Sequence, residues 1–339
     1  MTDLSNLRHQ RGTGLIDRAS PRNFGMSPIQ SSKTIQKRKG ISLSKYTIIP
    51  DIHADPDRLD RSLRSCRMGH KIAFLGDLID AGAAVNAPDD AAVLAQVRRL
   101  VDDGLAVAVM GNHELNAILF HRIGRDGKPL RLRDAKNLRQ HQSFCDRFGV
   151  GTAAALAWTR WFLDLPLWLD LGDLRLVHAC WNPAAIATIA ARRPDGCLRE
   201  ADLEEVAGKQ TAFARAVHLL LTGPEIPLPP SVSFTDAGGH VRSDVRIAWW
   251  RSDAPTWRAA ALSVPEPADL PDAKIGPTDG VAFYDPADPP VLVGHYKMTG
   301  EPMIEAPHAA CLDYPRSACV YHWSGEISLR QDSLIKVGE

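Results

Sequence analysis

A strand-like apolar run followed by a helix-like pattern occurs three times between residues 46 and 121. The strand-like runs are Tyr46–Ile49, Lys71–Leu75 and Leu105–Met110, and the helix-like patterns are Asp57–Cys66, Pro88–Asp103 and Glu114–His121. This alternation predicts a partly parallel sheet with helical crossovers. Two later apolar runs, Leu174–Val177 and Val291–Val293, predict further strands. The expected fold class is therefore α/β.

Asp, Asn or His residues follow each of these five runs. In chain order they are Asp51 and His53; Asp77 and Asp80; Asn112 and His113; His178; and His295. Ligands in open α/β sheets sit at the carboxyl ends of the strands, so we expect these side chains to meet there. Any one of them alone is as easily a turn or capping residue.

The chemistry of this set suits a pair of divalent metal ions. Imidazoles mixed with carboxylates favour Mn²⁺, Fe or Zn²⁺ over Mg²⁺ or Ca²⁺, which prefer oxygen ligands. A central carboxylate can bridge two ions about 3.5–4 Å apart, the separation used in two-metal hydrolysis. Glycines at positions 76, 111 and 294 precede the candidate ligands and would let the backbone approach the ions closely.

Five segments carry a resemblance to a known family: "PDIHAD", "GDLIDAG", "GNHE", "VHACWNP" and "VGHYKMTG". In this order they resemble the metal-binding blocks of the calcineurin-like metallophosphoesterases. They are most similar to the phosphoprotein phosphatases and the dinucleoside-tetraphosphatases. The resemblance covers roughly residues 45–330. It implies two mixed sheets packed face to face and flanked by helices, with a dimetal site at the strand ends.

The resemblance also implies a role for each residue of the set. Asp51 and His53 would hold the first metal, and Asp77 would bridge both ions. The second metal would be completed by Asn112, His178 and His295. The implied reaction is attack on phosphorus by a metal-bridging hydroxide, with His113 as the general acid that protonates the leaving oxygen and Asp80 orienting its ring.

This chain departs from the family pattern at three places. Pro50 and Ala54 stand where the family usually has glycines, and we expect only a local backbone adjustment. Lys297 replaces the last histidine of a Gly-His-x-His block, which favours the phosphoprotein-phosphatase arrangement. Ala81 replaces the arginine that normally grips substrate phosphate. Candidates for that missing role are Arg251, Arg246, Lys297, Arg122, Lys136 and Arg139.

Charge is balanced overall, with 40 Lys and Arg against 40 Asp and Glu, and points to neither a nucleic acid nor a membrane partner. Residues 1–43 hold eight basic residues against two acidic ones and are expected to form a disordered basic arm. The phosphoesterase domain would then span residues 44–339. A basic segment at about 121–147 predicts an exposed loop and helix beside the core, either a solvated face or a phosphate clamp.

The rest of the sequence sets weaker limits. Six scattered cysteines without a Cys-x-x-Cys pair fit a reducing compartment, so we expect a cytoplasmic protein. The Pro- and Gly-rich segments 223–239 and 264–290 are interpreted as long surface loops. Trp249, Trp250 and Trp257 could stack a nucleobase, but their apolar neighbours favour a place in the core.

Three functional hypotheses follow. The first is hydrolysis of a phosphate monoester, with phosphoserine or phosphothreonine in protein as one candidate substrate. The second is hydrolysis of a dinucleoside polyphosphate or nucleotide. The third is a non-catalytic metal-binding module of the same fold. A sequence-nonspecific nuclease is disfavoured because no extended basic surface supports a polynucleotide track.

Overall fold

The computed structural model describes residues 44–82, 84–236, 239–252, 256–276 and 281–338. These residues belong to one unit of the chain, residues 43–339. The expected basic arm, residues 1–43, lies outside the described residues.

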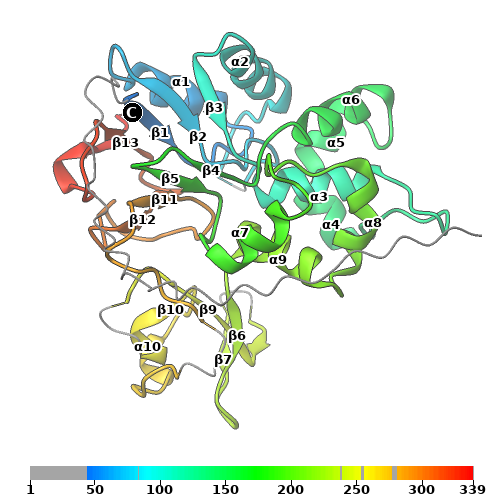
Figure 1. The fold of residues 1–339 in the computed structure, drawn as a ribbon. Coiled ribbons are helices and arrows are strands. Elements are labelled where there is room, and N and C mark those ends of the chain that lie inside the picture. Colours follow the sequence, from blue (N-terminus) through cyan, green and yellow to red (C-terminus); the bar gives the residue numbers. More distant parts are fainter. Residues whose placement is uncertain (1–43, 83, 237–238, 253–255, 277–280, 339) are drawn as a thin grey trace, which may run out of the picture. The chain divides into compact units, whose positions relative to one another are not determined.

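The predicted strand–helix alternation is present at the start of the described chain (Figure 1). Its elements are β1 (Tyr46–Ile49), α1 (Pro56–Arg64), β2 (Lys71–Phe74), α2 (Asp90–Asp102), β3 (Ala106–Ala108) and α3 (Asn112–His121). β1 pairs with β2 and β2 with β3, both in parallel, as the crossovers require. Helix α3 begins two residues earlier than predicted, because Gly111 is already its N-cap.

Two mixed sheets complete the core. The first has the order β14-β13-β1-β2-β3, with β13 (Cys319–Trp323) and β14 (Leu334–Lys336) running antiparallel to their neighbours. The second has the order β12-β11-β5-β4, formed by β4 (Trp168–Asp170), β5 (Arg175–Val177), β11 (Val291–Val293) and β12 (Ala309–Cys311). β11 pairs in parallel with both β5 and β12, so the carboxyl ends of these strands lie together.

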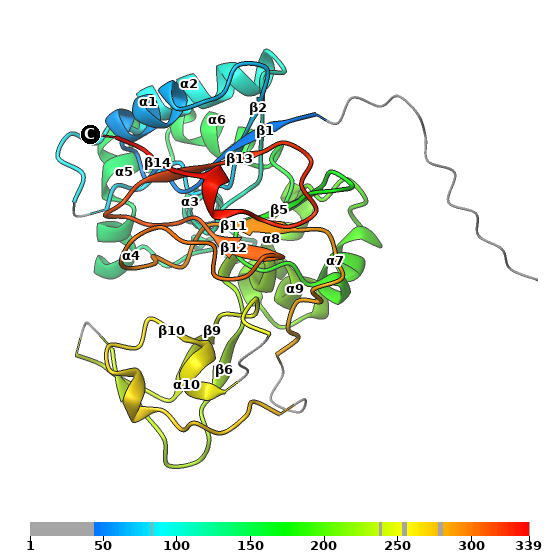
Figure 2. The same ribbon diagram turned by 90° about the vertical axis from the view of Figure 1, so that its left-hand side faces the viewer.

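The two sheets pack face to face through one apolar cluster. Ile48 and Ala73 of the first sheet and Leu176, Leu292 and Ala310 of the second are members of it, and all are fully buried. Because side chains alternate across a strand, the neighbouring Ile49 and Phe74 face the other way. They join a second cluster with Val93 and Val97 of α2. This double sandwich, flanked by helices, is the architecture that the resemblance implied (Figure 2).

Seven further helices follow α3 in the described part of the chain, and the first six of them lie before the small third sheet. These six are α4 (Ala135–Gln140), α5 (Gln142–Phe148), α6 (Ala153–Phe162), α7 (Pro183–Ala190), α8 (Leu203–Gly208) and α9 (Ala212–Thr222). The basic segment 121–147 was predicted to be an exposed loop and helix, and this is only half right. It contains two helices, and α5 packs Phe144 fully into the core. The many basic residues of this segment led to the prediction of an exposed surface, so the burial of Phe144 was not predicted.

A third, small sheet follows α9. It has the order β10-β9-β6, with β6 (Glu225–Pro227), β9 (Asp244–Ile247) and β10 (Ala261–Leu262), next to a hairpin of β7 (Phe234–Thr235) and β8 (Val241–Arg242). Interpreting 223–239 as a surface loop was therefore wrong, because β6 and β7 lie within it. These strands have two to four residues, too few for an alternating pattern to emerge among prolines and glycines.

The small sheet has its own apolar cluster, which includes Val245, Ile247 and Trp257, the first residue of α10 (Trp257–Ala260). Trp249 and Trp250 are fully buried in the main core. All three tryptophans are therefore core residues. The described residues also form short 3-10 helices at Glu200–Asp202, Pro267–Asp269 and Gln331–Ser333. Among the described residues, no helix is long and apolar enough to cross a membrane.

Candidate metal and phosphoester site

Hydrogen bonds donated by backbone N–H groups join the segments that follow β1, β2, β5 and β11. The N–H groups of Ile52 and His53 both donate to the carbonyl of Asp77, at 3.0 and 2.9 Å. Gly294 donates to the carbonyl of His178 at 2.9 Å, and the N–H of His295 donates to the carboxylate of Asp51. The candidate ligands therefore converge at one edge of the sandwich, as the strand-end pattern predicted.

The backbone at this edge is strained. Of the nine described non-glycine residues with positive φ, six lie in the candidate segments: His53, Ala54, Asp77, Asp80, His295 and Lys297. Such left-handed conformations are uncommon for non-glycine residues and cluster at functional sites. Ala54 has a φ of +54°, a conformation that glycine adopts more readily, at a position where the family usually has glycine.

Two glycines allow the segments to approach closely. Gly76 has a φ of +91°, and a Cβ there would collide with the backbone of Gly111. A Cβ on Gly294 would collide with the carboxylate of Asp51. Any side chain at these two positions would push the segments apart, so packing requires glycine at both, and the positive φ is a second requirement at Gly76.

The first group of donors consists of His53, Asp77 and His113, with Asp51 beside it. The Nε2 atom of His53 lies 3.9 Å from Asp51 Oδ2 and 4.0 Å from Asp77 Oδ2. Its Nδ1 atom faces the carbonyl oxygens of Asp80 and Ile79, at 3.1 and 3.3 Å, so Nδ1 carries the proton. Nε2 is then a free lone pair, buried and without a hydrogen-bond partner. This is the arrangement that metal-binding histidines adopt.

The second group consists of Asp77, His178 and His295, with Asn112 at its centre. The Oδ1 atom of Asn112 lies 3.0 Å from His178 Nε2 and 2.7 Å from His295 Nδ1, and His178 Nε2 lies 3.4 Å from Asp77 Oδ2. His178 Nδ1 donates to the carbonyl of Leu75, which leaves Nε2 to face the group. Both groups contain Asp77 and fit a divalent ion by donor type.

Charge around Asp77 favours its ionised form. Burial by itself raises the pKa of Asp77, but the imidazoles of His178 and His113 outweigh it and hold the pKa well below its usual range. Burial, aided by the neighbouring His113, lowers the pKa of His53. An ionised carboxylate beside a neutral imidazole is the protonation state that metal binding requires.

His113, a member of the first group, is the second residue of α3. Its Nδ1 atom is 2.7 Å from Asp80 Oδ2, and its Nε2 atom is 3.9 Å from Asp77 Oδ2. Burial lowers the pKa of His113, but Asp77 and Asp80 outweigh this and raise it to about 9. The His113–Asp80 contact that the resemblance implied is therefore present.

Glu114 contributes to the geometry in a way that sequence reasoning missed. Its buried carboxylate accepts the N–H groups of Asp77, Leu78 and Gly111, at 2.9, 2.8 and 2.9 Å. The last of these is half of a capping box for α3. The sequence marked Glu114 only as the first residue of a helix-like pattern, whereas in the structure it joins the second and third candidate segments.

The carboxylate of Asp313 and the imidazole of His141 also lie at the site, and neither of them was predicted there from the sequence. Asp313 follows β12, and its Oδ2 accepts the N–H of Lys297, whereas its buried Oδ1 has no hydrogen-bond partner. Burial first, and then Asp313, raise the pKa of Asp51 well above its usual value. His141 Nδ1 lies 2.6 Å from Asp80 Oδ1. Neither residue stands in a recognisable motif, so no sequence signal marked it.

The basic residues proposed to grip phosphate lie in different surroundings. Arg122 is paired with Glu200 at 2.7 Å and donates to Thr159. Arg251 is paired with Glu305 at 2.6 Å. Lys136 and Arg139 are exposed on α4. Lys297 is exposed and close enough to His53 to contribute to the lowering of its pKa, after burial and His113.

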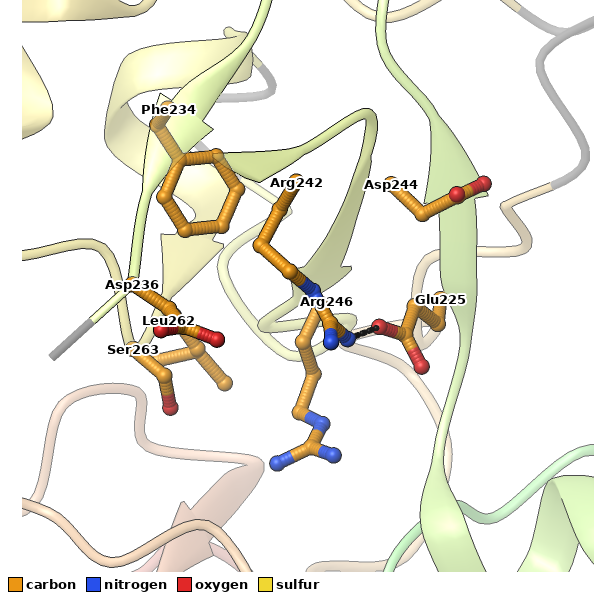
Figure 3. Close-up of a pocket in the computed structure, with 8 residues that line it drawn as sticks. All are labelled: Glu225, Phe234, Asp236, Arg242, Asp244, Arg246, Leu262 and Ser263. Atoms are coloured by element: carbon orange, nitrogen blue, oxygen red, sulfur yellow. Dashed lines mark hydrogen bonds and ion pairs between the residues drawn. The ribbon is translucent and has the colours of Figure 1, made fainter. Parts of the chain in front are cut away.

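Arg246 is the remaining candidate, on β9 of the small sheet. Figure 3 shows it beside a hollow where Arg242 is paired with Glu225, and the side chain of Arg246 extends away from that pair. Its Nε atom is buried without a hydrogen-bond partner. Burial, His178 and then Arg246 lower the pKa of His295, which places the guanidinium within electrostatic reach of the second donor group.

The sequence of this chain was compared with models of known protein families. The model of the calcineurin-like phosphoesterases matches residues 44–190, which contain the first four of the five candidate segments. Residues 44–190 therefore carry a calcineurin-like phosphoesterase domain, and the protein is a phosphate-ester hydrolase. The fifth segment, which begins at Val293, lies beyond the matched residues.

Solved structures give distant similarities, and no curated protein matches the chain. A protein proposed to be a diadenosine tetraphosphatase is 15% identical, with a TM-score of 0.40 over 87% of this chain and 93% of that one. A cold-active protein-tyrosine phosphatase of a psychrophilic Shewanella species is 12% identical, with a TM-score of 0.44 over 87% and 81%. A protein serine/threonine phosphatase from Saccharomyces cerevisiae is 12% identical, with a TM-score of 0.40 over 87% and 79%.

Proposed function

We propose that the protein is a binuclear metal-dependent phosphatase that hydrolyses a phosphate monoester. The observation that carries this proposal is the position of Asp77, whose carboxylate belongs to both donor groups. A shared carboxylate is what a pair of ions in one hydrolytic site needs. In this proposal residues 44–339 form the phosphoesterase domain, preceded by the basic arm 1–43.

Six side chains would hold the ions. Asp51 and His53 would serve the first ion, Asn112, His178 and His295 the second, and Asp77 both. Their mixture of imidazole and carboxylate favours Mn²⁺, Fe or Zn²⁺. The ions, when bound, would neutralise charge on the phosphate and activate water for attack on phosphorus. The buried, unpartnered Nε2 atom of His53 supports this assignment, since a buried polar atom without a partner is costly.

His113 would protonate the leaving oxygen. Its Nδ1 atom donates to Asp80, so a proton on Nε2 faces the donor groups and is available to the substrate. Asp80 fixes the orientation of the ring and stabilises its charged form.

Arg246 and Lys297 are the residues that we favour for the phosphate grip that Ala81 cannot supply. Both act electrostatically on candidate ligands, whereas Arg122 and Arg251 already have carboxylate partners. A guanidinium with a buried, unpartnered Nε still has donors to offer phosphate oxygens. Arg246→Lys should therefore raise KM for a phosphate monoester by about 10-fold, as expected for a lost charged hydrogen bond. An unchanged KM would exclude Arg246 from this role.

The test is hydrolysis by metal-stripped protein with and without added Mn²⁺. Substrates are p-nitrophenyl phosphate, a phosphothreonine peptide and a diadenosine polyphosphate, and the control variants are Asp77→Asn and His113→Ala. We expect Mn²⁺-dependent turnover that both substitutions abolish. Preference for the peptide would support the phosphoprotein phosphatase branch, and preference for the diadenosine substrate would support the alternative, a dinucleoside polyphosphate hydrolase.

The non-catalytic alternative makes the opposite prediction. Protein that binds two metals but turns over none of these substrates would be a binding module of the same fold. The complete donor set, together with the His113–Asp80 contact, favours catalysis. The cytoplasmic location expected from the cysteines stays a prediction.

A further inference from the structure

Two buried histidines continue the hydrogen-bond chain beyond Asp80. The Oδ2 atom of Asp80 lies 2.7 Å from His113 Nδ1, and its Oδ1 atom lies 2.6 Å from His141 Nδ1. His141 Nε2 lies 3.0 Å from the Nε2 of His121, and His121 Nδ1 accepts the backbone N–H of Gly151 at 3.0 Å. The proposed function gives no role to His121 or His141.

The backbone N–H of Gly151 determines where every proton in this chain lies. A backbone amide only donates, so His121 Nδ1 is an acceptor without a proton. The neutral ring of His121 therefore carries its proton on Nε2 and donates it to His141 Nε2. His141 must then carry its single proton on Nδ1 and donate it to Asp80. Burial is the largest cause of the low pKa of His121, about 4, which agrees with a neutral ring.

The same reasoning excludes a metal ion at this place. His121, His141 and Cys145 have potential ligand atoms within 4.8 Å of one another. A neutral histidine that binds metal through Nε2 carries its proton on Nδ1. In His121 that proton would face the N–H of Gly151, placing two donors against each other at 3.0 Å. The direct His121–His141 hydrogen bond satisfies both rings instead.

Packing holds His141 in this orientation. Its ring stacks on Phe144, with centroids 4.7 Å apart and an interplanar angle of 16°, and both side chains are buried. Two residues along the chain, the Oγ of Ser143 accepts the N–H of Ala81 at 3.0 Å. The start of α5 therefore contacts Asp80 through His141 and Ala81 through Ser143.

We infer that His141 is a positioning residue for the catalytic acid. Neutral His141, oriented by His121, donates to Asp80 and holds its carboxylate in the orientation that presents His113 Nε2 to the leaving group. Burial raises the pKa of Asp80, whereas the hydrogen bonds that it accepts from His113 and His141 lower it, and the net shift is downward. This inference rests on the proposed function, in which His113 is the acid.

The test compares two substitutions on two substrates. His141→Phe keeps the aromatic stacking and removes the donor, whereas His141→Asn keeps an amide N–H near the position of Nδ1. A poor leaving group, in phenyl phosphate, requires an acid, whereas the good leaving group of 2,4-dinitrophenyl phosphate does not. We expect His141→Phe to lower kcat for phenyl phosphate by about 10- to 100-fold, the range for a hydrogen bond to a charged group.

The same substitution should change kcat for 2,4-dinitrophenyl phosphate by less than about threefold and leave KM unchanged for both. His141→Asn should restore most of the lost activity. His322→Phe, a matched change at another buried histidine, should affect both substrates equally. An equal loss on both substrates with His141→Phe, or no rescue by asparagine, would show a merely structural role and overturn the inference.

A second measurement does not depend on activity. Nitrogen NMR of histidine-labelled, Zn²⁺-loaded protein should place the proton of His121 on Nε2 and that of His141 on Nδ1. The opposite tautomer of His121, or a third metal equivalent that Cys145→Ser removes, would overturn the inference. If the wild-type protein were inactive on both substrates, the proposed function would be overturned instead. The measured tautomers of His121 and His141 would then test only the hydrogen-bond chain.

Discussion

Glu114 joins three backbone segments through one buried carboxylate, and its effect can be measured on its own. Glu114→Gln would place an amide NH₂ against N–H groups that the carboxylate now accepts, from Asp77, Leu78 and Gly111. We expect the free energy of unfolding to fall by about 1–3 kcal/mol, the cost of unsatisfied buried donors. Urea denaturation measures this loss.

Glu204→Gln is the matched control for that experiment. Glu204 pairs with the exposed Arg125, and surface ion pairs contribute at most about 1 kcal/mol. Equal losses in the two variants would mean that Glu114 does not anchor the site.

His121 links protein stability to pH in a defined direction. Its pKa is lowered to about 4, with burial as the largest cause, against an ordinary value of about 6.5 in the unfolded chain. Between these values the unfolded state binds a proton that the folded state does not, so stability falls as pH falls from about 6.5 to about 4. His121→Phe should flatten this part of the curve for metal-free protein, measured by urea denaturation at several pH values. An identical curve would contradict the assignment.

At the scale of the single element, capping determines where the helices start. Asp89 caps α2, accepting the N–H of Ala92 at 3.0 Å, and its own N–H donates to the carbonyl of Ala54. Asp89→Ala should lower the free energy of unfolding by about 1 kcal/mol. Asp103→Ala, at the other end of α2, removes a charge that opposes the helix dipole and should be neutral or slightly stabilising. Thermal unfolding of both variants checks the contrast, and equal effects would refute it.

Element boundaries and short strands show the limits of sequence reasoning at this scale. β1, β2 and β11 were predicted to within one residue, because their apolar runs are bounded by polar and glycine residues. The strands β6 and β7 were missed, since their side chains are apolar only where the small sheet packs on itself. Phe144 was missed for a similar reason, as one aromatic residue among basic neighbours gives no periodicity.

At the scale of the whole molecule, the donor groups predict that metal stabilises the fold. Burial is the largest cause that raises the pKa of Asp51, and the nearby carboxylates of Asp313 and Asp77 raise it further. The repulsion among these three carboxylates opposes folding without a cation. Ions that bind only the folded chain stabilise it by mass action, by about 2.7 kcal/mol at a concentration of 100 Kd. Adding Mn²⁺ to chelator-treated protein should therefore raise Tm, and Asp77→Asn should abolish most of the rise. If Mn²⁺ did not change Tm, the assignment of both donor groups as metal sites would be wrong.

The sequence by itself determined the α/β core and the strand-end residues Asp51, His53, Asp77, Asn112, His178 and His295. These follow from local order along the chain, since a ligand placed directly after a buried strand lies at the sheet edge in any arrangement of that sheet. Five such segments, matched to one family, also indicated phosphate-ester hydrolysis.

Only the tertiary structure decided which distant side chains meet. His141, the N-cap of α5, contacts Asp80, and Asp313, beyond β12, contacts Lys297. Arg246 of the small sheet acts on His295 through its charge, and none of the three stands in a motif. Their roles depend on hydrogen-bond direction, burial and separation in space. These properties arise when segments far apart in the chain pack together, and no local pattern in the sequence records them.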